Sequence, residues 1–147
     1  MPRVAAVQAD IEAPSVEQNI QPQYGPPGPP IPRSGREYIV WLIHHWSAYY
    51  EYTDTAKAEA IVSCEGGFND PHICNKQYGC RAGQGHAQFI PSTWANMENA
   101  IGVKDVFDSS DNIQGLIYLL KTSGDQHWGT LTTEWGSARC WIPKLKM

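Results

Sequence analysis

Proline is distributed unevenly along this chain, and its distribution limits where a fold can form. Eight of the eleven prolines lie within the first 32 residues. The run from Pro22 to Pro32 cannot sustain the hydrogen bonding of a helix or a sheet, and it favours an extended, semi-rigid chain. We therefore expect residues 1–34 to form a disordered Pro-rich arm or linker and residues 35–147 to form one folded domain. The composition of the arm favours a plain spacer over an attachment segment for a larger assembly.

Charge and hydropathy argue against two classes of protein. The formal net charge is -4, whereas nucleic-acid-binding domains usually carry a basic patch. No apolar run approaches the roughly 20 residues that a membrane helix needs, so we expect no membrane span. The N-terminus shows no apolar segment of the signal-peptide type. The 4 cysteines fit two disulfides and allow three pairings, and disulfides favour an oxidising compartment.

Apolar residues recur at helical spacing in four segments, which predicts a mainly α fold. The segments begin at Ser34, at Thr53 or Asp54, at Pro91, and between Asp108 and Asp111, all of which are suited to a helix start. Ser34 also has the spacing of a capping box to Glu37. We expect no strand, and residues 126–141 show no clear period. The expected core faces are Ile39, Leu42, Ile43, Trp46, Tyr49 and Tyr50 in the first helix, Trp94, Met97 and Ile101 in the third, and Ile113, Leu116, Ile117 and Leu120 in the fourth.

Glu65 is the residue that first suggests a function. It lies at the end of the second predicted helix, where Gly66 or Gly67 stops the helix, and it shares a face with apolar residues such as Ile61 and Val62. We expect its carboxyl to point into the fold, where desolvation and the helix dipole both raise the pKa. A carboxyl that stays protonated near neutral pH is what a general acid needs. A surface glutamate near a helix end is the commoner case and remains the alternative.

Residues 66–90 form a long connection with few helix or strand signals, and loops of this length are usually functional. The connection contains His72, Cys74, Cys80 and His86, whose side chains are of the types that bind zinc. Their spacing is looser than the usual zinc pattern and favours a local Cys74–Cys80 disulfide. We expect no metal and no other cofactor. Cys140 could connect the C-terminal segment to Cys64, and closing a loop of that length would stabilise the fold by a few kcal/mol.

Three separated motifs together carry a family resemblance. They are residues 64–69 (Cys-Glu-Gly-Gly-Phe-Asn), 85–94 (Gly-His-Ala-Gln-Phe-Ile-Pro-Ser-Thr-Trp) and 135–141 (Trp-Gly-Ser-Ala-Arg-Cys-Trp). The chain resembles the soluble lytic transglycosylases of the lysozyme superfamily, whose Glu-Ser and Gly-Leu-x-Gln motifs correspond to the first two. It is also similar to resuscitation-promoting-factor domains. The resemblance covers residues 36–141 and implies a small lysozyme-like helical domain with a long active-site loop. Such a domain cleaves the β-1,4 bond between N-acetylmuramic acid and N-acetylglucosamine in peptidoglycan.

The resemblance implies roles for individual residues. Glu65 corresponds to the catalytic acid, Gln88 to the motif glutamine that lines the sugar cleft, and Thr93 to a threonine that contacts substrate. Gln126 and Trp135 match cleft residues less closely, and Cys64 and Cys140 match a bonded pair. Independently of the resemblance, the aromatic rings of Tyr78 and Trp135 could stack on sugars, with core packing as the alternative.

The chain departs from the family pattern at three places. Gly66 stands where the family usually has serine, which removes a hydroxyl beside the acid. His86 and Ala87 replace an apolar pair before the glutamine. The third motif lacks the Ala-Tyr-Asn of many transglycosylases.

Glycoside cleavage usually uses two carboxyl groups, but only Asp70 lies near Glu65 in the sequence. The other acids considered could approach Glu65 only through folding; they are Asp54, Glu98, Asp108, Asp111 and Glu134. We therefore hypothesise a lone general acid/base of the lytic-transglycosylase type, acting on peptidoglycan glycan strands. The alternatives are a hydrolytic muramidase of the same fold, a virion or cell-wall module that binds peptidoglycan without turnover, and a zinc domain. Because the substrate lies outside the cytoplasmic membrane, we expect a protein that is secreted, virion-associated or released at phage lysis.

Overall fold

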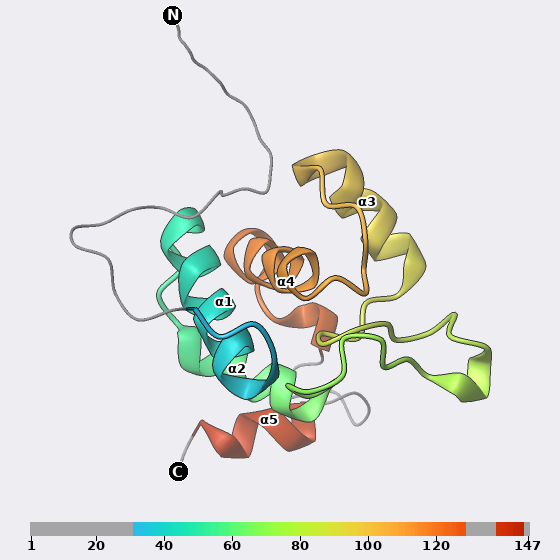
Figure 1. The fold of residues 1–147 in the computed structure, drawn as a ribbon, viewed down its shortest axis with the longest axis horizontal. Helices are drawn as coiled ribbons and strands as arrows, with labels where there is room; N and C mark the ends of the chain where they lie inside the picture. The colour runs from blue at the N-terminus through green and yellow to red at the C-terminus, as the bar shows by residue number, and fades with distance from the viewer. Residues whose placement is uncertain (1–30, 129–137, 146–147) are drawn as a thin grey trace, which may run out of the picture. The chain divides into compact units, whose positions relative to one another are not determined.

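The protein is mainly helical. A computed structural model describes residues 31–128 and 138–145, and backbone contacts divide the chain into Met1–Pro30 and Ile31–Met147. The expected Pro-rich arm therefore lies almost wholly outside the described residues. None of the helices in the described ranges combines the length and the apolar character that a bilayer span needs. The elements, drawn in Figure 1, are α1 (Gly35–Tyr50), α2 (Thr55–Cys64), η2 (Lys76–Tyr78), α3 (Pro91–Ile101), α4 (Ser109–Ser123), η3 (Gln126–Trp128) and α5 (Ala138–Lys144).

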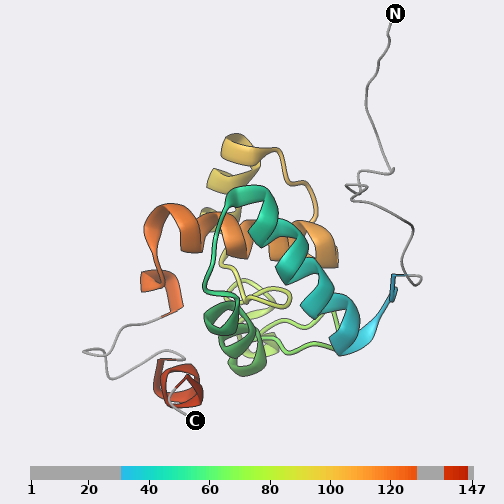
Figure 2. The same cartoon turned by 90° about the vertical axis from the view of Figure 1, so that its left-hand side faces the viewer.

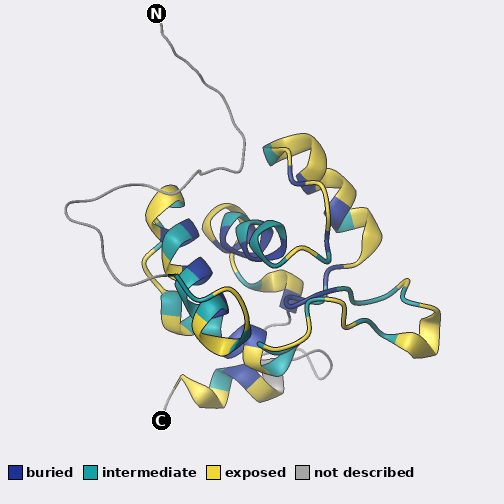
Figure 3. Cartoon of the chain, viewed as in Figure 1, coloured by how far each residue is buried: buried dark blue, intermediate teal, exposed yellow. Residues whose placement is uncertain are grey.

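Helix α4 forms the centre of the core. It lies between α1 and α3 in Figure 1 and contacts α1, α2 and α3. The view at right angles in Figure 2 also shows α1 lying across α4. Burial follows the same arrangement, and α4 is mostly dark blue and teal in Figure 3, with exposed residues at its C-terminal end. The expected apolar faces of the two helices meet here, with Ile39, Leu42, Ile43 and Trp46 from α1 and Ile113, Leu116, Ile117 and Leu120 from α4 all buried.

The helix boundaries follow the local signals closely. Helix α3 runs from the predicted proline to the residue before Gly102, whose φ of 77° ends it. The Asp108 side chain accepts the Asp111 N–H and caps α4, as expected. Two predictions for α1 were wrong. Ser34 occupies the N-cap position without a side-chain capping bond, and Tyr49 is 69% exposed because it lies at the edge of the apolar stripe.

The C-terminal part is more ordered than its sequence pattern indicated. Residues 126–128 form η3, and α5 packs against α2. Helix α5 has seven residues, fewer than two turns, and contains Pro143, so it is too short to show a helical period. Tertiary interactions hold it: Trp141 is 2% exposed, and Cys140 is bonded to Cys64 at the end of α2.

Candidate active site

Glu65 lies directly after α2 and caps its C-terminus. Its backbone N–H donates to Ile61 O at 2.9 Å, and its side chain is half-buried. Two residues later, the Gly67 N–H donates to Val62 O at 2.8 Å, a six-to-one bond of the kind that closes helix ends. Gly67 has a φ of 81°, so it is the residue whose left-handed backbone turns the chain away from α2. The helix end thus fixes the backbone on both sides of the Glu65 carboxyl.

The long connection after Glu65 folds into a hairpin closed by a disulfide. Cys74 and Cys80 are joined, as expected, so their sulfurs are not free to bind zinc as thiolates. In the described part of the chain, β structure consists of isolated bridges from Gln84 to Cys74 and to Phe89. Figure 1 shows η2 at the outer end of this hairpin, projecting from the helical body. Tyr78 is in η2 and is 57% exposed, so it packs in no core.

The first two motifs meet at Gly66. Its N–H donates to His86 O at 2.8 Å, and Gly66 itself is buried. A Cβ at this position would lie 2.9 Å from both the Gly85 carbonyl carbon and the His86 Cα, with the Gly85 oxygen closer still. Atoms of a real side chain do not approach backbone so closely, so the residue after Glu65 must be glycine here. Glycine in place of the serine of the transglycosylases that the sequence resembles therefore has a steric cause in this fold.

Gln88 also contacts the place where the first two motifs meet. Its side-chain Nε2 donates to Gly85 O at 2.8 Å, the carbonyl that lies against Gly66. Gln88 has a φ of 54°, and a left-handed backbone costs a residue other than glycine about 1 kcal/mol. Strain of this kind persists only where the surroundings fix it, and it is concentrated at functional sites. The structure thus places the motif glutamine beside the turn that follows Glu65.

His86 ties this junction to α4. The ring is 1% exposed, with Nδ1 2.7 Å from Gly67 O and Nε2 2.9 Å from Ser109 Oγ. Burial lowers the pKa of His86, while the hydrogen bond to Gly67 and the charges of Asp70 and Asp108 act in the opposite direction. At neutral pH the ring is therefore uncharged. Because a carbonyl only accepts, Nδ1 carries the proton and Nε2 accepts from the Ser109 hydroxyl.

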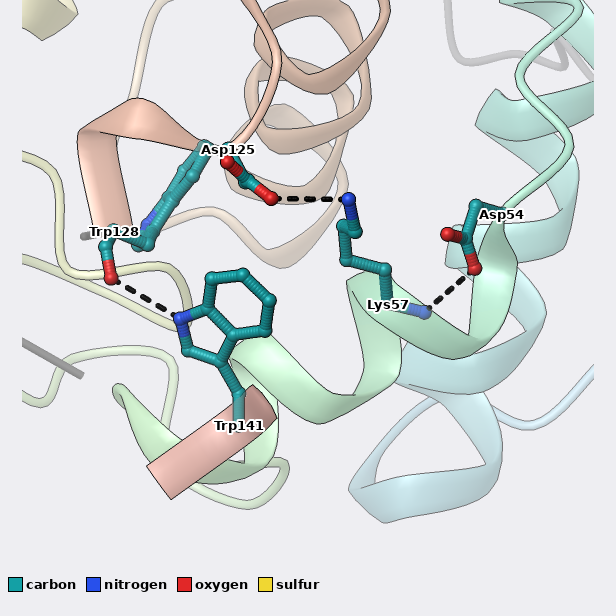
Figure 4. A network of polar contacts seen from close by, with 5 residues as sticks. All are labelled: Asp54, Lys57, Asp125, Trp128 and Trp141. Carbon is teal, nitrogen blue, oxygen red and sulfur yellow. Dashed lines mark hydrogen bonds and ion pairs between the residues drawn. The ribbon is translucent and has the colours of Figure 1, made fainter. Parts of the chain in front are cut away.

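Buried side chains also hold the residue between His86 and Gln88. The Ala87 N–H donates to Asn112 Oδ1 at 2.9 Å, and its carbonyl accepts from Trp128 Nε1 at 2.8 Å. Trp141 Nε1 in turn donates to Trp128 O at 3.1 Å, as Figure 4 shows. A continuous series of buried hydrogen bonds thus runs from α4 through the second motif to α5.

An ion pair lies beside that series. Lys57 Nζ is 3.0 Å from Asp125 Oδ2, and its ammonium lies 5.9 Å from the centre of the Trp141 ring (Figure 4). Asp54 caps α2 by accepting the Lys57 N–H at 3.2 Å. Both partners of the pair are partly exposed, so it contributes at most about 1 kcal/mol. Its position links the start of α2 to the segment before η3.

The remaining site residues are dispersed. Thr93 is half-buried in the first turn of α3, which begins three residues after Gln88, and Gln126 is exposed in η3. Trp135 lies outside the described residues. Cys64 and Cys140 are bonded, which matches the pairing implied by the resemblance. No group of three His, Cys, Asp or Glu side chains in the described ranges could hold a metal ion.

The acids considered as a second carboxylate separate into three groups. Asp54 caps the start of α2, ten residues and about 15 Å from its end. Asp111 accepts the N–H groups of Lys104 and Asp105, both at 3.0 Å, Glu98 is exposed on α3, and Glu134 is not described. Asp70 and Asp108 both act electrostatically on His86, which contacts the turn after Glu65. Of this set, they are therefore the acids whose charges act on a residue at the junction of the two motifs.

Comparisons with protein-family models, with curated proteins and with solved structures return no match to this chain. The functional reading accordingly depends on the residues described above. Sequence reasoning missed Ser109, Asn112 and the bridging role of His86, which together hold the second motif in place. Asn112 carries a signal that could have been found, because a polar residue in step with Leu116 and Leu119 is expected to be buried. Ser109 carries none, since its partner lies 23 residues away.

Proposed function

We propose that this chain degrades peptidoglycan by cleaving the β-1,4 bond between N-acetylmuramic acid and N-acetylglucosamine, with Glu65 as the lone general acid/base. The observation that supports the proposal is the direct docking of the two motifs. Gly66, beside the acid, bonds to His86 O at 2.8 Å, and Gln88 bonds to Gly85 O at 2.8 Å. An acid at a helix end and a strained glutamine therefore share one junction, although 23 residues separate them in the sequence. Preorganised groups of this kind are what glycoside cleavage requires.

The proposed reaction uses one carboxyl twice. Glu65 in its protonated form donates its proton to the glycosidic oxygen, and the bond from that oxygen to the anomeric carbon breaks. The resulting carboxylate then removes the proton from the 6-hydroxyl of the muramic acid. The 6-oxygen attacks the anomeric carbon, which gives a 1,6-anhydro product and returns the proton to Glu65. If water takes the place of the 6-hydroxyl, the same site is a muramidase.

Substrate contacts are proposed for the residues around this junction. Gln88 and Thr93 would line the cleft, Tyr78 would stack on a sugar from the hairpin tip, and Gln126 and Trp135 would contact the strand from the C-terminal segment. The disulfides fit an extracytoplasmic site of action, which is where the substrate lies.

Digestion of purified peptidoglycan tests the proposal, with three proteins compared: wild type, Glu65→Gln and Glu59→Gln. Glu59 is a matched control because it is a partly buried glutamate in α2, the helix that Glu65 caps, and lies 3.7 Å from Arg36 and 3.8 Å from His44. We expect Glu65→Gln to lose at least about 100-fold in turnover and Glu59→Gln to retain it. Wild-type turnover by Glu65→Gln would remove Glu65 from the catalytic role.

Mass spectrometry of the products separates the remaining alternatives. Anhydro-muramic ends support the transglycosylase reaction, and hydrated reducing ends with no anhydro product would show a muramidase. Binding to peptidoglycan without any soluble product would show a module that does not turn over.

A further inference from the structure

His86 is a polar side chain inside the core of the site, at a position where the resembling family has an apolar residue. It is 1% exposed, and both ring nitrogens have partners. Both partners are distant in the chain: Gly67 lies at the start of the connection, directly after α2, and Ser109 is the first residue of α4. The ring therefore bridges two elements that are 42 residues apart in the chain.

The backbone and the ring of His86 hold the two residues that follow Glu65. The His86 carbonyl accepts the Gly66 N–H at 2.8 Å, and Nδ1 donates to Gly67 O at 2.7 Å. On the other side, Nε2 accepts from Ser109 Oγ at 2.9 Å. Asn112, one turn further along α4, fixes the backbone of the loop through the Ala87 N–H. The turn after Glu65 is thus held against α4, the helix at the centre of the core.

We propose that His86 is a positioning residue for Glu65: its neutral ring fixes the Gly66–Gly67 turn to the start of α4 and thereby aims the Glu65 carboxyl. This inference rests on the proposed function for its effect on catalysis, but its effect on the Glu65 carboxyl can be measured without substrate. According to this proposal, His86 contributes to catalysis without contacting the substrate. It also makes activity depend on the protonation state of a buried histidine.

The bridge is specific to the neutral ring. A second proton on Nε2 would force the Ser109 hydroxyl to change from donor to acceptor and would place a cation in a buried site. The charged groups that act on the ring are Asp70, in the turn after α2, and Asp108, which caps α4. Both favour the cation, but burial outweighs them and lowers the pKa. The bridge is thus complete above about pH 6.5 and is lost only as the pH falls below that value.

Three variants separate positioning from packing. His86→Leu restores an apolar residue and removes both ring bonds. His86→Asn keeps a donor near the place of Nδ1, facing Gly67 O, but cannot titrate near neutral pH. Ser109→Ala leaves the ring and its Gly67 bond and removes only the partner on α4. Thermal denaturation followed by circular dichroism establishes that each variant is folded at the assay temperature.

Steady-state kinetics on soluble peptidoglycan fragments give the first readout. We expect His86→Leu to lower kcat about 10- to 100-fold with KM changed less than about threefold, as for a displaced catalytic group. His86→Asn should recover most of kcat, and its loss of activity toward acidic pH should be shallower than that of wild type. Ser109→Ala should lie between wild type and His86→Leu. Unchanged kcat in His86→Leu, or equal loss in the leucine and asparagine variants, would overturn the proposal.

NMR gives a second readout that does not depend on turnover. With 13C-labelled glutamate, the titration midpoint of the Glu65 carboxyl should move by about half a unit or more in His86→Leu and by less in His86→Asn. A midpoint that is the same in all three proteins would exclude positioning, whatever the activity. A wild-type protein that cleaves no peptidoglycan would instead refute the proposed function, while a shifted midpoint would still uphold the structural link.

Discussion

The glycine directly after the candidate catalytic acid is the position at which the structure makes its sharpest prediction. A Cβ at Gly66 would meet backbone atoms of Gly85 and His86, two of them at 2.9 Å. Backbone cannot move aside as a flexible side chain can, so the loop must shift away from α2. Overpacking costs about 1–3 kcal/mol and the lost Gly66 N–H bond about 1 kcal/mol, so we expect Gly66→Ala to destabilise the fold by about 2–4 kcal/mol.

The neighbouring glycine is a matched control. No atom lies within 4 Å of a Cβ built on Gly67, but its φ of 81° is unfavourable for any other residue. Gly67→Ala therefore has a backbone cost alone, about 1–2 kcal/mol. Urea denaturation followed by tryptophan fluorescence measures both variants. If Gly67→Ala costs as much as Gly66→Ala, the steric argument is wrong.

The family-like substitution sharpens the same prediction. Gly66→Ser restores the usual motif, yet we expect it to be at least as destabilising as Gly66→Ala, because the hydroxyl adds volume to the same contact. A double-mutant cycle then tests whether Gly66 and His86 act together. Once Gly66→Ala has displaced the loop, the bonds of the His86 ring are already weakened. The cost of combining it with His86→Leu should therefore be less than additive by about 1 kcal/mol, and strict additivity would refute the coupling.

Two further predictions concern the disulfides and pH. The chain-entropy model gives about 4.5 kcal/mol for Cys64–Cys140, which spans 76 residues, and about 2 kcal/mol for Cys74–Cys80, which spans 6. Replacing each pair by serines should reproduce this order in urea denaturation, and equal losses would contradict it. Burial lowers the pKa of His86 and of His45, so each contributes stability that is present above about pH 6.5 and is lost as the pH falls below that value. Between about pH 7.5 and 5.5, His86→Asn should lose less unfolding free energy than wild type, and a parallel decline would show that His86 has the same pKa in the folded and unfolded states.

The helices could be predicted where their signals are local. Helix α3 begins at Pro91 and ends before Gly102 because proline at the first turn and a left-handed glycine after the last are properties of single positions. Helix α5 could not, because seven residues show no period and the helix is held by Trp141 and by a disulfide to Cys64. Periodicity finds helices that bury a long face, whereas tertiary contacts stabilise the short ones.

In the candidate site, too, residues with a local sequence signal could be predicted and residues positioned by tertiary contacts could not. Glu65 and Gln88 could be selected from their motifs, and Glu65 also from its apolar face. Asn112 could be selected by the same reasoning, because it is in step with Leu116 on one face of the helix and is fully buried. The sequence singles out His86 only as a departure from the motif and as a side chain of a type that binds zinc. Its partners lie 19 and 23 residues away, and only the packing of the loop onto α4 brings them together.

Gly66 and His86, two of the positions at which the chain differs from the transglycosylase motifs that it resembles, form one physical feature. Without a Cβ at Gly66, the backbone at Gly85 and His86 can dock directly on the turn after Glu65. That docking brings the His86 ring to Gly67 on one side and to Ser109 on the other, where an apolar side chain would leave both polar groups without this partner. Gly67 and Ser109 are half-buried, and a hydrogen bond contributes about 0.5–1.5 kcal/mol net, so each departure makes the other more favourable. The missing serine hydroxyl is therefore no argument against our proposal for Glu65: the turn after Glu65 is held by His86, whose ring also bonds to Ser109 at the start of α4.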